Sequence, residues 1–253
     1  METYFNIRYE FDREAVHDRI AGQLESGEAD YICVADGVIL NTANRNPDYL
    51  AVVNGGMFAV CDSSYVPLYL RWIYGIERRQ YCGSEIFMDI VKSCRYRMCF
   101  MGTHQTVLDG LRENLMKVNP AVEGMMFSEL PFLSVEEFDY AEIARRINED
   151  NPEIIWVALG APKQEIFMNR LKPHLNRGVM IAVGAAFKFY SGKDEKRAPQ
   201  WMIRNHLEFV YRIFSEPKKQ IKRCWGIIST LPRLLYEEYG RKRNKKKSNN
   251  ING

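Results

Sequence analysis

Short apolar runs recur along the chain, and small or polar residues that open a helix-like pattern follow them. The clearest runs, residues 154–159 and 179–183, have the length and composition of strands buried on both faces. Further runs of the same character lie at residues 31–34, 57–61, 97–101 and 122–127. Strands of this kind are typical of a parallel sheet that helices cover on both sides.

Helical patterns fill the intervals between these runs. Helices are predicted over residues 14–24, 47–54 and 135–148, from about residue 66, and around Val107, Leu111 and Leu115. The alternation predicts an α/β fold with a doubly wound, mainly parallel, Rossmann-like sheet and right-handed crossovers. Ligands of such folds bind at the carboxyl edge of the sheet, so the turns after the strands are the candidate site.

Length and charge indicate one large domain with an appendage. The chain has 253 residues, 46% of them apolar, which is enough for a sizeable core. Its net charge of +3 is unevenly distributed, because residues 217–253 contain eleven Lys or Arg and two Glu. We therefore predict an α/β catalytic domain at 1–199, a basic amphipathic helical appendage at 200–240 and a disordered basic tail at 241–253.

Cysteine usage and hydropathy lead to an expectation about location. The six cysteines form no CxxC pair and show no metal-ligand spacing with the four histidines, which favours reduced thiols, a cytosolic protein and no metal site. The amino terminus is too charged for a signal peptide, and no run of about 18 apolar residues predicts a membrane span. Any membrane contact is expected to be peripheral.

The turns after the predicted strands contain residues suited to polar ligands. Gly160 lets the backbone approach a ligand, and Gln164 reaches polar atoms from the first helical turn. Gly102 and Thr103 stand at a predicted helix start, whose free N–H groups favour a phosphate. An ordinary strand-to-helix connection explains such turns equally well. The chain has no GxGxxG and no P-loop, so a dinucleotide cofactor is not expected.

A more specific signal is the succession of GAPKQE, VGAAFKFYSG, RAPQWM and HLEFVYRIFSEPKK between residues 160 and 219. Together these motifs resemble the WecG/TagA/CpsF family of bacterial glycosyltransferases, and the resemblance extends over residues 34–223. It implies transfer of N-acetylmannosamine, its uronic acid or a related hexose from a UDP-sugar to an undecaprenyl-diphosphate-linked sugar, in cell-surface polysaccharide synthesis. It also implies inversion at the anomeric carbon and no metal or other cofactor.

The resemblance implies roles for single residues. Asp62, directly after a predicted strand, would be the general base that deprotonates the acceptor hydroxyl. Read from its neighbours alone, Asp62 is a cap for the helix that starts near residue 66. The residues implied to bind donor or acceptor are Asp36, Gly102, Thr103, Gly160, Lys163, Gln164, Glu165 and Gly184.

The amino-terminal half departs from the family pattern. Thr42-Ala43-Asn44 looks like the family's Thr-Pro-Asn, but only residues 34–36 in that place keep the spacing to Asp62. In this preferred alignment Val34 lacks the family hydroxyl and Asp36 replaces an amide, which would mark a different sugar.

A second departure lies in residues 78–85, which resemble the family's Arg-Val-Thr-Gly-Ser-Asp but have Glu85 in place of the Asp. Gln80 stands where the family arginine usually lies, and Arg79 is a weak candidate to supply the cation from the neighbouring position. The departures favour, as an alternative, a non-catalytic scaffold protein that binds the membrane surface. An enzyme that acts on a soluble nucleotide sugar, such as an epimerase, is a second alternative.

The carboxyl-terminal segment is basic and amphipathic. Its predicted apolar stripe consists of Ile221, Trp225, Ile228, Leu231 and Leu235. The resemblance implies that four cations meet the acceptor diphosphate or the membrane, namely Arg212, Lys218, Lys219 and Lys222. Such a helix commonly packs its stripe on the core, but the basic excess here favours an anionic membrane surface.

The expected partners follow from these features. They are a UDP-sugar donor, a polyprenyl-diphosphate-linked sugar acceptor and the anionic inner face of the cell membrane. The family also includes homo-oligomers. Nucleic acid is not an expected partner, since no platform studded with aromatic residues accompanies the basic run.

Overall fold

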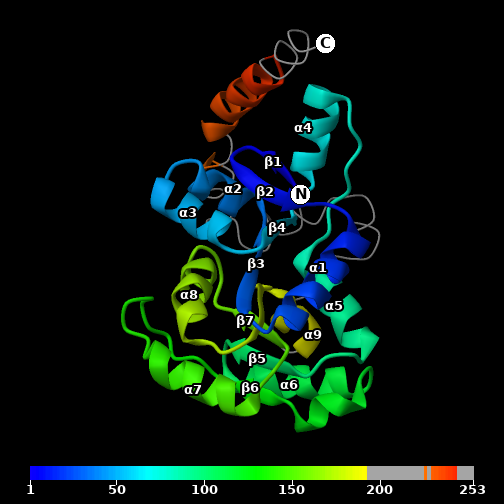
Figure 1. The fold of residues 1–253 in the computed structure, drawn as a ribbon, viewed down its shortest axis with the longest axis vertical. Helices are drawn as coiled ribbons and strands as arrows, with labels where there is room; N and C mark the ends of the chain where they lie inside the picture. Colours follow the sequence, from blue (N-terminus) through cyan, green and yellow to red (C-terminus); the bar gives the residue numbers. More distant parts are fainter. Residues whose placement is uncertain (193–224, 227–228, 244–253) are drawn as a thin grey trace.

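An eight-stranded sheet forms the centre of the molecule, in the order β1-β2-β4-β3-β8-β7-β5-β6 (Figure 1). This computed structural model describes residues 1–192, 225–226 and 229–243. The strands are β1 Glu2–Tyr4, β2 Ile7–Glu10, β3 Ala29–Ala35, β4 Phe58–Cys61, β5 Met98–Gly102, β6 Met126–Ser128, β7 Ile154–Ala158 and β8 Gly178–Ala182. Only β1 and β2 pair antiparallel in this sheet. The predicted α/β class and mainly parallel sheet are confirmed.

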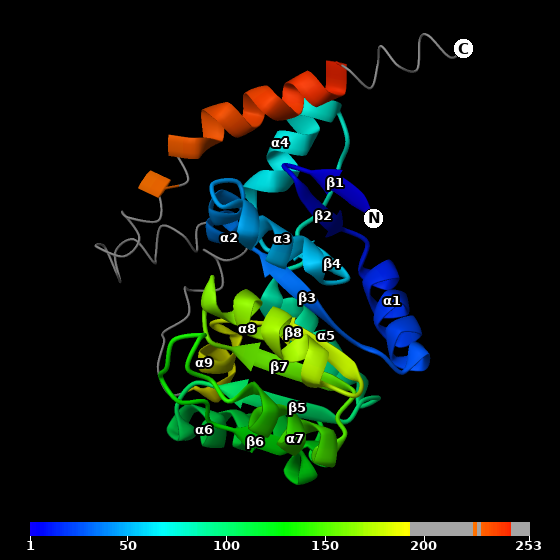
Figure 2. The same ribbon diagram turned by 60° about the vertical axis from the view of Figure 1, so that its left-hand side comes forward.

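Helices cover both faces of the sheet, as Figures 1 and 2 show. The first face carries α2 Gly37–Ala43, α3 Pro47–Gly55, α4 Tyr65–Tyr74, α7 Tyr140–Asp150 and α8 Lys163–Leu171, which a short 3-10 turn, Lys172–His174, follows. The second face carries α1 Arg13–Ser26, α5 Gly83–Ser93, α6 Gln105–Met116 and α9 Ala186–Ser191. Strand residues alternate between the two cores, so that Cys33 of β3 belongs to the first and Val34 to the second.

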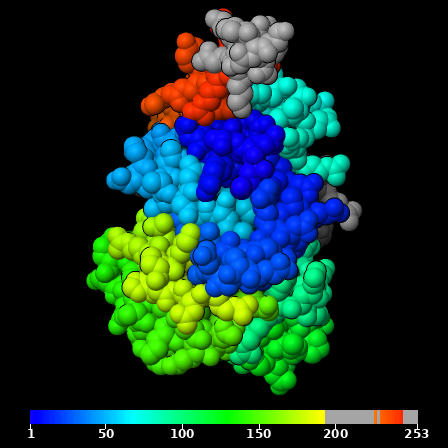
Figure 3. All heavy atoms as spheres, viewed as in Figure 1, coloured from blue at the N-terminus to red at the C-terminus, as the bar shows by residue number. Residues whose placement is uncertain are grey.

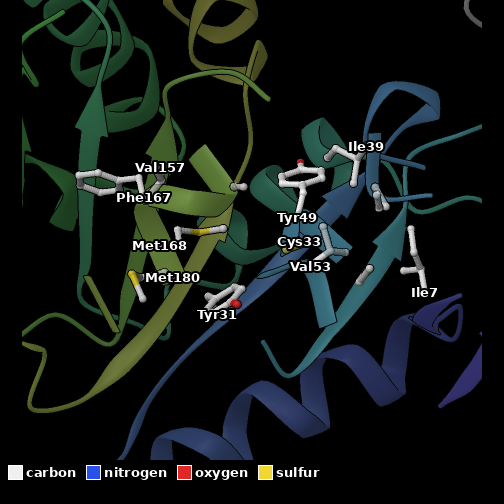
Figure 4. Packing of buried hydrophobic residues seen from close by; sticks show 14 of the residues in the cluster. Ile7, Tyr31, Cys33, Ile39, Tyr49, Val53, Val157, Phe167, Met168 and Met180 are labelled. Atoms are coloured by element: carbon white, nitrogen blue, oxygen red, sulfur yellow. The ribbon is translucent and has the colours of Figure 1, made fainter. Parts of the chain in front are cut away.

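The first core fixes α3 and α8 relative to each other. Figure 4 shows Phe167 and Met168 of α8 on one side, Tyr49 of α3 on the other, and Tyr31 of β3 between them. The Tyr31 hydroxyl donates to the carbonyl of Val52 in α3 and accepts from the side-chain amide of Asn169 in α8, at 3.0 Å. Polar groups close to α3 and α8 therefore have a rigid frame.

The winding of the chain reverses between the neighbouring strands β5 and β7. Strand β5 continues through α6, on the second face, to the edge strand β6, whereas β7 continues through α8, on the first face, to β8. At such a reversal the two following helices leave on opposite faces, and in open α/β sheets the ligand crevice lies between their amino ends. We call this region, between the amino ends of α6 and α8, the crevice. This is the place in the fold where a ligand is expected.

Two predicted elements differ in the structure. Of residues 122–127, only the end is strand, because a 3-10 turn over Pro120–Gly124 precedes β6. The side chain of Asn119 accepts from the N–H of Ala121 and starts this turn, while Pro120 has no N–H to give to a sheet. The helix predicted from residue 135 begins at Tyr140, where Asp139 caps it by accepting from the N–H of Glu142 at 3.0 Å.

A further helix, residues 229–243, lies at one end of the molecule beside the β1–β2 hairpin and α2 (Figure 3). Leu234, 5% exposed, joins the first core. Glu238, 1% exposed, accepts from the backbone N–H of Phe5 at 2.8 Å and from the hydroxyl of Tyr74 at 2.7 Å. The helix is therefore attached to the domain by apolar and by polar contacts.

The predicted stripe of this helix is partly wrong. Leu231 and Leu235 are partly buried, but Trp225 is 73% exposed and Leu234, outside the stripe, is the buried leucine. Residues 221 and 228 of the stripe lie outside the described residues. The expected boundary between appendage and disordered tail, at residue 240, falls inside the helix.

Candidate functional site

Five neighbouring strands, β4, β3, β8, β7 and β5, bring the predicted site residues to one edge of the sheet. Asp62 follows β4, Asp36 follows β3, Gly184 lies just beyond β8, Gly160 lies just beyond β7, and Gly102 ends β5. Because all five strands are parallel, these residues share the carboxyl edge. The predicted site residues therefore lie along one edge, over five adjacent strands.

The turn after β7 is held by its own first helical residues. Gly160, with φ of +79°, donates its N–H to Oε1 of Gln164 at 3.1 Å. Nε2 of Gln164 in turn donates to Oε1 of Glu165 at 2.8 Å, and Oε2 of Glu165 accepts from the hydroxyl of Tyr49 at 3.0 Å. A continuous chain of hydrogen bonds therefore runs from α3 to the turn at the crevice.

Glu165 is a buried carboxyl group within this chain of bonds. Its side chain is 0% exposed, so Glu165 does not contact a ligand at the surface as the sequence had indicated. Burial raises the pKa of Glu165 to about 7, against the hydrogen bonds from Gln164, from its own backbone and from Tyr49, and the charge of Asp36 adds to the increase. Gln164 is 4% exposed and lies between Glu165 and the turn.

Two further turns at this edge adopt left-handed backbone conformations. Gly102 has φ of +110° and Thr103 has φ of +58°, directly before α6. A Cβ on Gly102 would lie 2.5 Å from the carbonyl oxygen of Ala158, so the ends of β5 and β7 touch through backbone atoms. Gly184 has φ of +49°, and a Cβ there would lie 3.8 Å from Oε1 of Gln164. The turns thus form a closely spaced, largely backbone surface.

Asp62 binds the amino end of a helix, but not of the helix predicted. Its Oδ1 accepts from the N–H of Gly83, the first residue of α5, at 3.0 Å. Helix α4 is capped instead at Ser64, without a side-chain hydrogen bond. The half-buried Asp62 carboxylate is therefore anchored on one side by a helix terminus, where the helix dipole stabilises negative charge.

Sequence reasoning did not identify α5 as a part of this site. A Cβ on Gly83 would lie 3.1 Å from a methyl carbon of Val34 and 3.8 Å from the Cα of Val183. The amino end of α5 thus sits against the ends of β3 and β8 as well as Asp62. Residues 78–85 resemble a family motif, but that resemblance did not indicate the packing of Gly83, which depends on the crossover between distant strands.

Asp36 has a structural role at the end of β3. Its Oδ1 accepts from the N–H groups of Val38 and Ile39, both at 2.9 Å, and so caps α2. Asp62 donates its own backbone N–H to the carbonyl of Ala35, so the two aspartates stand on adjacent strand ends. Thr42-Ala43-Asn44 lies at the end of α2 instead, which favours the alignment that places Asp36 at the site.

The other predicted residues lie less centrally. Nζ of Lys163 stands 5.2 Å from the ring centre of the exposed Phe132 and 5.1 Å from that of Phe138. Arg79 is exposed and Gln80 is half-buried in the segment between α4 and α5. Four predicted basic contacts lie outside the described residues, namely Arg212, Lys218, Lys219 and Lys222.

The carboxyl-terminal helix borders this edge. Thr230 and Leu231 line a small cavity together with Gly37, which follows Asp36, and Ser63, which follows Asp62. A broader open hollow lies along α7 near His174, at the amino end of β8, and is remote from the crevice. The carboxyl edge, where polar groups and helix ends converge, is therefore the better candidate site.

Comparison with known proteins agrees with this geometry. The model of the family described as "Glycosyl transferase WecG/TagA/CpsF family" matches residues 4–248. The chain belongs to the WecG/TagA/CpsF family of glycosyltransferases. The resemblance seen in the motifs is confirmed. We expect other members of this family to have a similar arrangement of residues at the carboxyl edge of the sheet.

Individual relatives in the WecG/TagA/CpsF family are distant but cover most of the chain. A protein of Bacillus subtilis (strain 168) is 25% identical over 97% of this chain and 93% of its own length. A protein of Bacillus spizizenii (strain W23) is 26% identical, with coverages of 84% and 79%, and one of Staphylococcus aureus (strain MW2) is 24% identical, with 86% and 83%. All three are named N-acetylglucosaminyldiphosphoundecaprenol N-acetyl-beta-D-mannosaminyltransferase.

The described helices of this family member include no membrane-spanning segment. Within residues 1–192 and the described carboxyl-terminal helix, no helix combines the length and the apolar character needed to cross a bilayer.

Proposed function

We propose that this chain transfers N-acetylmannosamine, or a closely related hexose, from a UDP-sugar to the sugar of an undecaprenyl-diphosphate-linked acceptor. The names of the relatives support the acceptor and the transferred sugar. The observation that carries the proposal is Asp62, a half-buried carboxylate at the edge where Asp36, Gly160 and Gly184 also end their strands. A carboxylate on the same edge as a backbone-lined crevice suits the deprotonation of a sugar hydroxyl.

The proposed chemistry is a single displacement. Asp62 takes the proton from the acceptor hydroxyl, whose oxygen attacks the anomeric carbon of the donor sugar. The bond between that carbon and the diphosphate oxygen breaks, UDP leaves with the electron pair, and the configuration inverts. The hydrogen bond from Gly83 holds Oδ1 in place, so that the carboxylate is oriented before the substrate arrives.

The crevice between α6 and α8 is proposed to hold the donor diphosphate. Gly102, Thr103 and Gly160 bring backbone close to a ligand there, and the amino ends of α6 and α8 stabilise anions. Gln164 is proposed to set the shape of this turn. Asp36, although it caps α2, is proposed to stand near the sugar because it lies one strand away from Asp62.

Peripheral attachment to the inner face of the cell membrane is part of the proposal. The acceptor lipid must be reached at a bilayer, and residues 217–253 contain eleven basic residues. Each basic residue near an anionic bilayer contributes on the order of 1 kcal/mol. Binding should therefore weaken as salt increases.

The deciding experiment measures UDP release. Purified full-length protein is incubated with a panel of UDP-sugars and a short-chain analogue of GlcNAc-diphosphate-polyprenyl, with and without anionic vesicles. Release that needs both substrates, and that falls when the chain is truncated after Pro217, supports the transferase and its tail. Release without acceptor and unaffected by truncation would favour an enzyme of soluble nucleotide sugars, and no release with retained vesicle binding would favour the scaffold.

The base is tested with Asp62→Asn. The amide oxygen of Asn still accepts from Gly83, so the fold should persist, while loss of the base should reduce transfer by about 10²- to 10⁴-fold. Asp139→Asn is the matched control, because Asp139 also accepts from a helix-terminal N–H, that of Glu142 in α7, and has no role in the proposed chemistry. Full activity of Asp62→Asn would reject the assignment of Asp62 as base.

A further inference from the structure

The hydrogen-bond chain behind the crevice contains a carboxyl group with no direct access to substrate. Glu165 is 0% exposed, and its pKa is raised mainly by burial. A buried carboxyl is costly to ionise, and a glutamine or an apolar residue would avoid that cost. The question is what an acidic group supplies at this position.

An ionised Glu165 satisfies both hydrogen-bond partners at once. The hydroxyl of Tyr49 and Nε2 of Gln164 approach different oxygens of Glu165, at 3.0 Å and 2.8 Å. Nε2 can only donate, and the Tyr49 hydroxyl has its proton available for the second oxygen. A protonated Glu165 would carry a hydrogen on one oxygen. On Oε1 that hydrogen would face the donor Nε2 of Gln164, and on Oε2 it would turn the Tyr49 hydroxyl into an acceptor, whose own proton then loses Glu165 as its partner.

The orientation of Gln164 depends on this arrangement. Its Oε1 accepts from Gly160, so its Nε2 must be the atom that meets Glu165. If the amide turned over to accept from a protonated Glu165, Nε2 would face the N–H of Gly160, and two donors would oppose each other. Protonation of Glu165 therefore disturbs this chain at one point: at the bond to Tyr49 if Oε2 carries the proton, and at the bond to Gln164 or to Gly160 if Oε1 does.

We propose that Glu165 and Tyr49 are positioning residues, which in the ionised state of Glu165 fix the Gln164 amide and, through it, the Gly160 turn that receives the substrate. The inference rests on the proposed transferase function and adds a pH-dependent element to its site. Neither Glu165 nor Tyr49 contacts substrate. They act through Gln164, which joins the rigid frame of α3 and α8 to the crevice.

The groups that face Glu165 determine the pH at which its carboxyl group titrates. Tyr49 faces it from α3, and Cys33 and Asp36 act on it from the strand β3, while Gln164 belongs to its own helix. Burial is the largest cause of the raised pKa of Glu165, and the hydrogen bonds from Gln164 and Tyr49 oppose it. Loss of the Tyr49 donor should thus move the titration to higher pH.

The test is the pH profile of transfer in three proteins. In the wild type, kcat/KM should rise with a midpoint near pH 7, so that about a tenth of the plateau remains one pH unit lower. Tyr49→Phe removes one donor and should move this midpoint up by about one pH unit. Glu165→Gln should abolish the limb near pH 7 and lower the plateau, since its amide cannot accept from both neighbours.

Controls separate positioning from loss of fold. Tyr81→Phe also removes a hydroxyl that donates to a carboxylate, Oδ2 of Asp89 at 2.8 Å, but on the second face of the sheet, and it should leave the midpoint unchanged. Thermal melts confirm folding of each variant, and if Glu165→Gln fails to fold, Tyr49→Phe decides alone. A folded Tyr49→Phe with the wild-type midpoint overturns the inference, whereas absence of turnover in the wild type overturns the proposed function and the inference with it.

Discussion

At the scale of single residues, ionisation of Glu165 lowers the stability of the fold, although the ionised form is the one proposed to hold Gln164 in place. Its pKa is raised to about 7 in the fold, compared with the ordinary value of 4.5, so the folded protein binds a proton more tightly than the unfolded chain. The contribution is fully present below pH 4.5 and is lost as pH rises through 7. The free energy of unfolding should therefore fall by about 3 kcal/mol over this range because of Glu165 alone.

Comparison of wild type and Glu165→Gln isolates this contribution. Urea unfolding at pH 5 and pH 8 should give a larger decrease in the free energy of unfolding for the wild type than for the variant. Other titrating groups contribute equally to both proteins and cancel. An equal change in the two proteins would mean that Glu165 keeps its ordinary pKa in the fold.

The residues predicted at the site illustrate what sequence can supply. Asp62, Gly160 and Gln164 were found because they stand in motifs that follow apolar runs, and the structure places all three at the carboxyl edge. Tyr49 could not be found in this way, since its contact with Glu165 joins positions 116 residues apart. Glu165 belongs to the same motif as Gln164, but its burial depends on packing between α3 and α8.

At the scale of elements, the close contact between the ends of β5 and β7 requires glycine at residue 102. Gly102 has φ of +110°, and its missing Cβ leaves room for the carbonyl of Ala158. Gly102→Ala should cost about 3 kcal/mol of folding free energy, because backbone strain and a contact of 2.5 Å add together. Chemical denaturation measures this loss.

Gly27→Ala is the control for backbone strain without contact. Gly27 caps α1 with φ of +73°, and no atom lies within 4 Å of a Cβ built there. Its substitution should cost only about 1 kcal/mol. Similar losses for the two variants would show that the close approach of β5 and β7 is not what requires glycine at Gly102.

Elements with continuous apolar runs were predicted well, and the exceptions have physical reasons. The β1–β2 hairpin has no Asn-Gly turn, and its turn residues Phe5 and Asn6 adopt φ of +50° and +66°. Asn tolerates this region, but Phe does so only when other contacts hold it. Helix α2 was not predicted, because its start, Asp36-Gly37, is also a common turn sequence.

At the scale of the whole molecule, the carboxyl-terminal helix closes the fold on its amino-terminal hairpin. Glu238 accepts from the N–H of Phe5, a residue 233 positions away, and from the hydroxyl of Tyr74. The same helix begins beside the turns that follow Asp36 and Asp62. Periodicity predicted a helix near here, but not its contact with the hairpin, which joins Glu238 to Phe5 and Arg241 to Asn6.

Glu238→Ala should detach this helix. The substitution leaves the buried N–H of Phe5 without its acceptor and removes one of the two partners of Arg241, Asn6 being the other, which should cost about 3 kcal/mol. Hydrogen exchange should then become faster in residues 229–243 and in β1–β2, about tenfold for each 1.4 kcal/mol of lost local stability.

Glu237→Ala is the matched control: Glu237 pairs with Arg233 on the exposed side of the helix, a contact worth about 0.5 kcal/mol. If both variants exchange at the wild-type rate, Glu238 does not hold the helix. If Glu238→Ala also loses transfer while Asp62 and the sheet remain intact, the docked helix is required to complete the acceptor side of the edge.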